Sequence, residues 1–183
     1  ARGAMRECYR MKKMSQVNAN FFFNMNWEHC NNYVAKRYIK AGTAVDIYFA
    51  DVKMQMVAKR LSKMYNRKLP PKHVDFLHAF VIELQRDGQT MHFAVEMFVD
   101  GTYIKHNNNA GNLDFDGQHR ATPHAFSRFT FEATAGKTMI VDIQGVDTIY
   151  TDPQIHSSDG QGYGDGNLGV AGMALFFSTS QYD

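Results

Sequence analysis

The chain carries VDIQGVDTIYTDPQ at residues 141–154 and GYGDGNLG at residues 162–169. The first stretch continues an apolar run in which Asp142 and Gln144 stand two positions apart, so a strand would present both on one face. Asp152 follows after a turn that can return it to the same edge. Two carboxylates and an amide oxygen suit Mg²⁺, which completes its shell with waters and phosphate. The stretch therefore predicts either a magnesium site or two aspartates that cap turns.

The second stretch contains a glycine pattern, Gly164 to Gly169, of the form G-x-G-x-x-G. Such glycines let backbone amides approach a phosphate closely where a helix begins. The dinucleotide-binding version needs a strand directly before it, whereas a polar loop precedes it here. This stretch indicates either a phosphate-cradling loop or a plain loop with turn glycines. The GKT at 136–138 lacks the earlier glycine of a P-loop, because that position is Phe131, and it predicts only a helix stop before a strand.

Composition narrows the class of protein. The 183 residues, of which 44% are hydrophobic and 21% charged, are enough for one folded domain or a compact two-lobed unit. A net charge of +2, with scattered Lys and Arg, does not favour a nucleic-acid partner. No run approaches the roughly 20 apolar residues of a membrane span. The two cysteines, Cys8 and Cys30, favour a reducing compartment, and we expect a cytoplasmic protein. The start without Met suggests a piece of a longer chain.

Hydrophobic periodicity and turn residues predict an α+β fold with a sheet-rich part first and a mixed part second. The Asp-Gly pair at 87–88 favours a hairpin, and Thr122-Pro123 favours a helix start. The predicted order is helix 3–14, loop 15–31, strand 33–39, helix 46–67, hairpin strands 74–84 and 90–99, loop 107–117, helix 122–134, strand 138–143, loop 152–166 and a helix from 167 onward.

Lys36, in the strand motif YVAK at 33–36, is placed like the lysine that pairs with nucleotide phosphates in ordinary protein kinases. A lone strand lysine can equally be a solvated edge residue. The chain has no His-Arg-Asp, no Asp-Phe-Gly and no glycine-rich loop ahead of Lys36, so an ordinary protein kinase is excluded. Nor does any CxxC, HExxH or Cys/His quartet indicate a zinc site.

Several motifs in order give the chain a wider resemblance. They are GAMREC at 3–8, NYVAKRYI at 32–39, PPK at 70–72, YIK at 103–105, FTFE at 129–132, and DIQG, TDPQIH and GDGNLGV between 142 and 170. With them the chain resembles the alpha-kinase family of atypical protein kinases nearly end to end. The resemblance implies an ATP-dependent serine/threonine protein kinase that acts on a protein substrate such as elongation factor 2. It also implies a two-lobed, protein-kinase-like catalytic domain over 1–183, with an N-lobe at about 1–99 and a C-lobe at 100–183.

The resemblance also implies roles for single residues. Asp142 would be the catalytic aspartate, and Lys36 and Arg6, the latter in the first predicted helix, would contact the ATP phosphates. Gln144 and Asp152 would hold Mg²⁺. The hinge that holds adenine, largely through backbone groups, would contain Glu96, Met97 and Val99, and the loop tied to substrate handling would contain Gly164, Asp165, Gly166, Asn167 and Gly169.

Two departures from the family favour an alternative. The family's structural zinc is held by two histidines and two cysteines, but the matching positions here are Arg128, Ser180 and Tyr182, and the fourth would lie beyond the last residue. We therefore expect this zinc to be absent. A glutamate found in a member of the family is replaced by Val57. The alternative is a nucleotide-binding pseudokinase or regulatory module, and no motif identifies a regulatory partner.

Overall fold

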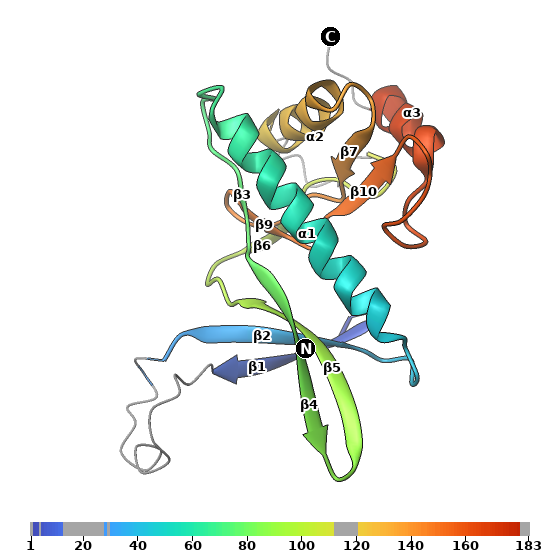
Figure 1. The fold of residues 1–183 in the computed structure, drawn as a ribbon. Coiled ribbons are helices and arrows are strands. Elements are labelled where there is room, and N and C mark those ends of the chain that lie inside the picture. The colour runs from blue at the N-terminus through green and yellow to red at the C-terminus, as the bar shows by residue number, and fades with distance from the viewer. Residues whose placement is uncertain (1, 4, 13–27, 29, 112–120, 180–183) are drawn as a thin grey trace.

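Figure 1 shows the computed structural model, which describes residues 2–3, 5–12, 28, 30–111 and 121–179. A sheet-rich lobe and a mixed lobe lie one above the other, with helix α1 running between them (Figure 1). The α+β expectation is thereby confirmed. The elements, in chain order, are β1 (Arg6–Lys12), β2 (Asn32–Tyr38), α1 (Val45–Asn66), β3 (Asp75–Phe76), β4 (Ala79–Arg86), β5 (Gln89–Met97), β6 (Tyr103–Lys105), α2 (Ala121–Ala133), β7 (Thr138–Val141), β8 (Gln144–Val146), β9 (Ile149–Thr151), β10 (Gln154–Ser157) and α3 (Gly169–Thr179).

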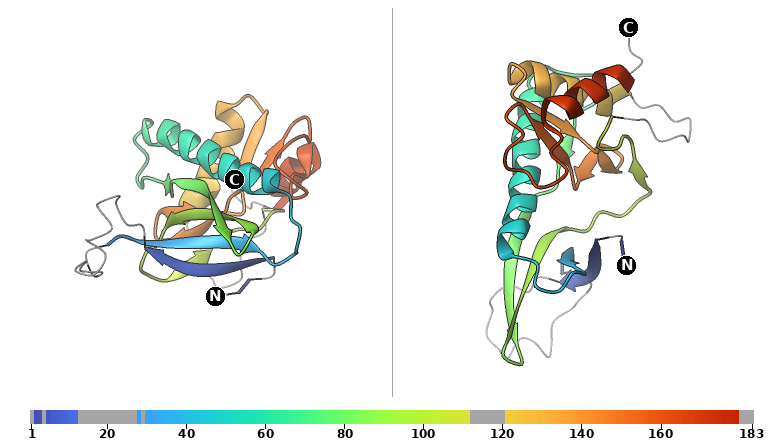
Figure 2. Two further views of the ribbon diagram at one scale, coloured as in Figure 1. Left: turned by 60° about the horizontal axis from the view of Figure 1, so that its bottom comes forward. Right: turned by 90° about the vertical axis from the view of Figure 1, so that its right-hand side faces the viewer.

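The first lobe is built on one antiparallel sheet in the order β1-β2-β5-β4. The predicted hairpin is confirmed, because β4 and β5 pair from Ala79 opposite Glu96 to Arg86 opposite Gln89. At its turn Asp87 and Gly88 both have positive φ, 52° and 74°, as the turns that suit the twist of hairpin strands require. Figure 2 shows this hairpin extending away from the second lobe.

The second lobe contains a four-stranded sheet, β3-β9-β8-β6, and the pair β10-β7. Its strands β3 and β9 run parallel, whereas β6, β8 and β9 are antiparallel neighbours. Helices α2 and α3 lie beside the β7-β10 pair (Figure 1). The β8-β9 hairpin has only two residues between its strands, so Gln144 and Thr151 face each other in register. This pairing brings the residues after β7 and after β9 together.

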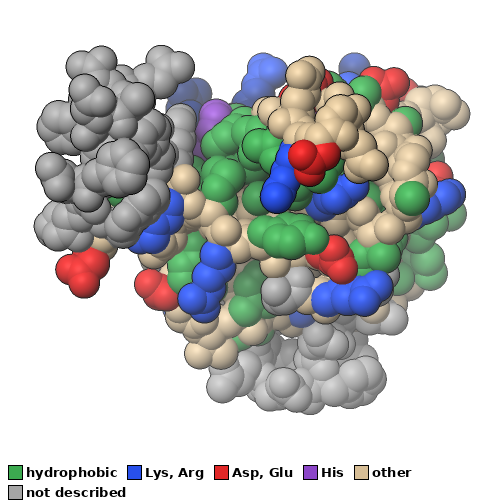
Figure 3. Space-filling model, turned by 90° about the horizontal axis from the view of Figure 1, so that it is seen from below, with side chains coloured by type: hydrophobic (Ala, Val, Ile, Leu, Met, Phe, Trp, Pro, Cys, Tyr) green, Lys and Arg blue, Asp and Glu red, His purple; other side chains and the backbone are tan. Residues whose placement is uncertain are grey.

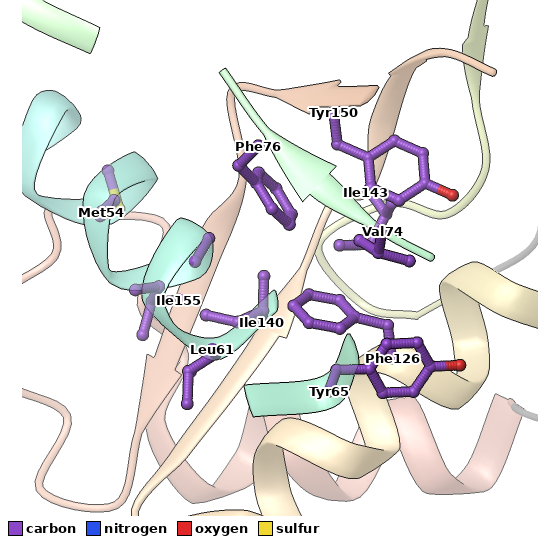
Figure 4. Packing of buried hydrophobic residues seen from close by; sticks show 11 residues of the cluster. Met54, Leu61, Tyr65, Val74, Phe76, Phe126, Ile140, Ile143, Tyr150 and Ile155 are labelled. Atoms are coloured by element: carbon purple, nitrogen blue, oxygen red, sulfur yellow. The ribbon is translucent and has the colours of Figure 1, made fainter. Parts of the chain in front are cut away.

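Helix α1 connects the two lobes. Its 22 residues span about 33 Å at 1.5 Å per residue. Met54, Leu61 and Tyr65, at helical spacing, bury one side of it in the core of the second lobe (Figure 4). The rest of that core comes from strands and from α2, and consists of Val74, Phe76, Phe126, Ile140, Ile143, Tyr150 and Ile155. Each such side chain contributes about 1.5–3 kcal/mol when fully buried, so the core fixes the angle at which α1 meets the first sheet.

Several sequence predictions are confirmed. The strand at 33–39, the helix at 46–67, the helix at 122–134 and the helix after 167 correspond to β2, α1, α2 and α3. The loops predicted at 15–31 and 107–117 fall largely or partly outside the described residues.

Other predictions are wrong. The helix predicted over 3–14 is strand β1, which pairs along its whole length with β2, so Arg6 faces one side of the sheet and Tyr9 stacks edge-on against Phe93 on the other. Pairing with a distant strand outweighs the helical propensity of this segment. The loop predicted over 152–166 contains β10, and the strand predicted over 138–143 ends at Val141.

The lower face of the molecule is mixed in charge (Figure 3). Figure 3 shows the lower face, on which Lys and Arg side chains are interspersed with Asp and Glu side chains and with hydrophobic ones. None of the helices that the structure describes has both the length and the apolar character needed to cross a membrane.

Candidate active site

A small pocket lies between the first sheet, α1 and the residue that follows β9. Charged side chains reach it from four places in the chain: Arg6 on β1, Lys36 on β2, Glu96 on β5 and Asp152 after β9. Asp51 joins them from α1. Residues 146 positions apart in sequence therefore share one site, which the antiparallel pairing of β1, β2 and β5 assembles.

Lys36 is the buried centre of this pocket. Its Nζ lies 2.6 Å from Oε1 of Glu96 and 2.8 Å from Oδ2 of Asp152. The Lys36 and Glu96 side chains are only 9% and 8% exposed. Burial alone would lower the pKa of Lys36, but the carboxylates of Asp152 and Glu96 raise it overall. The lysine is therefore held as an ammonium group, and it is not a solvated edge residue.

A second cation, Arg6, joins the two aspartates of the pocket. Its guanidinium lies 3.1 Å from Oδ1 of Asp152 and 3.3 Å from Oδ2 of Asp51. The Tyr38 hydroxyl donates a hydrogen bond of 2.8 Å to the same Asp51 oxygen. Burial raises the pKa of Asp152, but Lys36 and Arg6 lower it overall, so its carboxylate is ionised. Burial raises the pKa of Asp51 in spite of Arg6.

Asp142 and Gln144 lie next to this cluster. The chain leaves β7 at Asp142 with φ at +57°, so a turn of the backbone, and not strand alternation as predicted, brings the two side chains together. Gln144 donates from Nε2 to Oδ2 of Asp142 at 2.9 Å and to the carbonyl of Asp152 at 3.1 Å. The same Nε2 lies 3.3 Å from the Asp142 carbonyl. The amide nitrogen is thus occupied by protein, and Oε1 is the atom left to coordinate a cation.

Lys105 was not assigned a role from the sequence, although it lies in the YIK motif. Strand β6 places it opposite Gln144, and its Nζ lies 2.6 Å from Oδ1 of Asp142. Gln55, Asp51 and Thr151 were also missed. Sequence alone did not indicate a role for any of these four residues, because the partners that define their roles are distant in sequence.

The residues expected to form the hinge divide into two kinds. Glu96 is buried, and its side chain is turned toward Lys36. Met97, which ends β5, is exposed, and Val99 is half-buried just beyond it. The backbone amide of the intervening Phe98 donates to the carbonyl of Asn32, which ties the hinge to β2.

The glycine-rich loop does not line this pocket. It lies between β10 and α3, where Asn167 accepts hydrogen bonds from the backbone amides of Ser157 and Gly169. Gln154, the first residue of β10, connects this strand to the loop, because its side chain donates to the carbonyl of Tyr163. A Cβ on Gly166 would collide with the end of the same Gln154 side chain, so any larger residue there would displace Gln154.

The oxygen atoms of Asp142, Gln144 and Asp152 form a donor set that fits Mg²⁺, a hard cation that takes few protein ligands. Within residues 2–3, 5–12, 28, 30–111 and 121–179, no cluster of three or more His, Cys, Asp or Glu could hold a metal by itself. Arg128, one of the positions that the resemblance matched to a zinc ligand, pairs with Glu132 at 2.9 Å. Ser180 and Tyr182 lie outside the described residues.

Comparison with known proteins gives one consistent result. The sequence model of the Alpha-kinase family matches residues 1–182. Eukaryotic elongation factor 2 kinase of Homo sapiens is 51% identical over 177 residues, which are 96% of this chain and 23% of that protein. Alpha-protein kinase 1 of Dictyostelium discoideum is 46% identical over 183 residues, 99% of this chain and 12% of that protein. The chain thus spans about a quarter or less of the length of these relatives.

Solved structures are also similar. The alpha-kinase domain of myosin heavy chain kinase A in complex with AMP superimposes with a TM-score of 0.81 at 35% identity, over 100% of this chain and 83% of that one. An inactive variant of that domain in complex with ATP gives a TM-score of 0.81, also at 35% identity, over 100% of this chain and 82% of that one.

Proposed function

Because the chain belongs to the alpha-kinase family, we propose that it is the catalytic domain of an ATP-dependent serine/threonine protein kinase. The observation that carries the proposal is the convergence of Lys36, Asp142, Gln144 and Asp152 from three separate parts of the chain. Phosphoryl transfer needs mainly charge neutralisation and in-line positioning, and this set supplies cations, oxygen ligands and a carboxylate. The division into an N-lobe up to about Val99 and a C-lobe after it belongs to the proposal, with β3 reaching into the second sheet.

In this proposal Lys36 and Arg6 bind the ATP phosphates. Both are now paired with Asp152, and both remain cationic, since the pKa of Arg6 is also raised by its carboxylate neighbours, which outweigh its burial. Phosphate oxygens would take over part of the role of Asp152. The adenine would contact the backbone at Glu96, Met97 and Val99, next to the phosphate cations.

Asp142 would orient the substrate hydroxyl and accept its proton. Lys105 and Gln144 hold one carboxylate oxygen each, so they act as positioning residues that fix the direction of the carboxylate. Gln144 and Asp152 would hold Mg²⁺, which when bound neutralises phosphate charge. The loop containing Gly164, Asp165, Gly166, Asn167 and Gly169 would handle the protein substrate.

We propose elongation factor 2 as a substrate, because one relative with this specificity in its name is 51% identical. The proposal places the enzyme in the cytoplasm, with neither nucleic acid nor membrane as a partner.

The alternative of a pseudokinase rests on the lost zinc positions and on Val57, where a member of the family has glutamate, and the structure bears on the second of these. In this structure Val57 packs against the hydrophobic core. The carboxylate partners of Lys36 are Glu96 and Asp152, so the replacement leaves the lysine paired. This observation favours the active enzyme.

The experiment is phosphate transfer from labelled ATP to elongation factor 2 in the presence of Mg²⁺, with the purified chain. We expect transfer by the wild type and a loss of about 10²- to 10⁴-fold in Asp142→Asn, the range for removal of a general base. Asp87→Asn, on the exposed hairpin turn, is the matched control and keeps full activity. ATP binding without transfer by the wild type would favour the pseudokinase, and transfer that survives Asp142→Asn would refute the assigned role.

A further inference from the structure

Gln55 on α1 is a buried amide in direct contact with the charged pocket. Its side chain is 3% exposed. Nε2 donates to Oε2 of Glu96 at 2.8 Å and to the carbonyl of Leu77 at 3.0 Å. Oε1 accepts from the backbone N–H of Asp152 at 3.1 Å and lies 3.3 Å from the Thr151 hydroxyl. Both donors of the amide and its oxygen are therefore engaged.

The direction of this amide is fixed by its partners. Rotating it by half a turn would place its oxygen against the Glu96 carboxylate and the Leu77 carbonyl, and its NH₂ group against the backbone N–H of Asp152. Three repulsive contacts would replace three hydrogen bonds. A carboxylate or an apolar side chain of the same size could not satisfy donors and acceptors together.

The partners of Gln55 are the groups that hold Lys36. Glu96 offers Oε1 to Lys36 and Oε2 to Gln55, and the Thr151 hydroxyl also reaches Oε2, at 2.5 Å. Asp152 offers its carboxylate to Lys36 and its backbone N–H to Gln55. One amide thus contacts the carboxylate of Glu96 and the backbone of Asp152, the two residues that pair with the lysine.

We propose that Gln55 is a positioning residue for nucleotide and metal binding, which couples the position of α1 to Glu96 and Asp152. The inference rests on the proposed function of this site. Asp51 stands one helical turn earlier on the same face and contacts Arg6, so α1 reaches the pocket at two successive turns. A shift of α1 relative to the first sheet changes both contacts together.

A purely structural role for a buried polar residue is the competing account, and binding constants separate the two. Mg²⁺-dependent ATP affinity and the KM for ATP are measured together with thermal stability for the wild type, Gln55→Glu and Gln55→Met. Leu61→Ala, in the core part of the same helix, is the control that lowers stability without touching the pocket. We expect both Gln55 variants to weaken ATP binding about 10- to 100-fold, as for loss of hydrogen bonds to charged groups, and Leu61→Ala to leave it unchanged.

Unchanged ATP affinity in both variants, with only a lower melting temperature as in Leu61→Ala, would overturn the proposal. If Gln55→Glu does not fold, Gln55→Met alone decides by its affinity. The proposed function is tested by a different result: absence of phosphate transfer in the wild type would refute it. The comparison of ATP affinities does not depend on that transfer, so the two failures can be told apart.

Discussion

The pocket around Lys36 and the loop at residues 157–169 are both held by partly buried polar side chains, but the chemistry of the two differs. In the pocket, Lys36 and Arg6 neutralise Asp152 at distances of 2.8 and 3.1 Å. In the loop, the donors are neutral groups, and even the Asp159 carboxylate accepts from the Ser157 hydroxyl at 2.6 Å and from the backbone amide of Gln161 at 3.0 Å. Asn167 donates from Nδ2 to the Ser157 hydroxyl at 2.8 Å, and the amide of Leu168 donates to Nδ1 of His156 at 3.1 Å.

We therefore distinguish a site, whose ion pairs can be replaced by ion pairs with a ligand, from a scaffold, whose hydrogen bonds stay the same when a ligand binds. A carboxylate that satisfies two cations in the free protein can yield them to an incoming phosphate, because charge of the same sign replaces it. Neutral hydrogen bonds between loop and strand offer no such exchange. Variants of the pocket should therefore change binding and transfer, and variants of the loop's scaffold should change stability first.

The largest effect is expected from Lys36→Met. It leaves Glu96 and Asp152 facing each other without their shared cation, and breaking a buried ion pair by removing one partner costs about 3–5 kcal/mol of folding free energy. The side chain of Asp152 is 24% exposed, so the lower end applies. Phosphate transfer should fall about 10²- to 10³-fold further than the stability loss explains. The measurements are kcat/KM well below the melting temperature and a urea unfolding curve.

Lys59→Met is the control for that prediction. Lys59 also lies within ion-pair distance of a carboxylate, Asp75 at 2.9 Å, but outside the pocket, and Asp75 is 56% exposed. The pair is worth at most about 1 kcal/mol. Equal loss of transfer in both variants would remove the distinction between pocket and scaffold.

A smaller effect is expected from Gly172→Ala in α3, on the scaffold side of the comparison. A Cβ at this position would lie 2.6 Å from Nε2 of His156 and 2.7 Å from two other ring atoms, so ring or helix must move. Overpacking of this kind costs about 1–3 kcal/mol, against a gain of up to about 1 kcal/mol from helix propensity. Thermal unfolding measures the loss, and the KM for ATP should not change.

Ala174, which is exposed on the same helix, serves as a control that measures the effect of helix propensity alone. Ala174→Gly costs about 1 kcal/mol by propensity alone. A Gly172→Ala protein more stable than wild type would show that the contact with His156 relaxes without strain, and a changed KM for ATP would mean that the scaffold and the pocket are not separate.

A weaker effect comes from the titration of His156. Burial lowers the pKa of this ring, although the hydrogen bond to the carbonyl of Asn109 opposes the shift. The unfolded chain has the ordinary value of about 6.5 and binds a proton first as the pH falls. The contribution of neutral His156 to stability is thus complete above pH 6.5 and is lost progressively below it, at no more than about 1.4 kcal/mol per pH unit.

The comparison of wild type with His156→Asn isolates this proton. The rest of the sequence is the same in both proteins, so the stability difference between them should narrow between pH 7.5 and 5.5. A difference that stays constant with pH would contradict a neutral, buried His156 in the folded state.

The sequence predicted the parts of the site that depend on local spacing. Asp142, Gln144 and Asp152 lie within 11 residues, and the β8-β9 hairpin between them was predictable as a turn that returns the chain. The hairpin of β4 and β5 and helix α1 were predictable for the same reason, since turn residues and helical spacing are local signals.

The other parts of the site and of the fold depend on contacts between residues that are distant in sequence. Lys36 meets Asp152, 116 positions away, and Gln55 meets Glu96, 41 positions away, so no window of sequence contains both partners. The segment of β1 has good helix formers and becomes a strand only by pairing with β2. The resemblance to a family identified Lys36 and Arg6, whereas Gln55 and Lys105 required the contacts themselves.

The smallest effect is expected from removal of zinc. The family's zinc position in α2 is occupied by Arg128, a cation that cannot act as a ligand, and it pairs with Glu132 one turn later. Nearby, the His124 ring stacks on Phe176 with ring centroids 5.4 Å apart, so α2 and α3 contact each other through aromatic packing. A zinc chelator should therefore leave the melting temperature unchanged, and metal analysis of the purified chain should find no zinc in stoichiometric amount. One zinc per chain, lost together with stability on chelation, would contradict the expected absence of the zinc site.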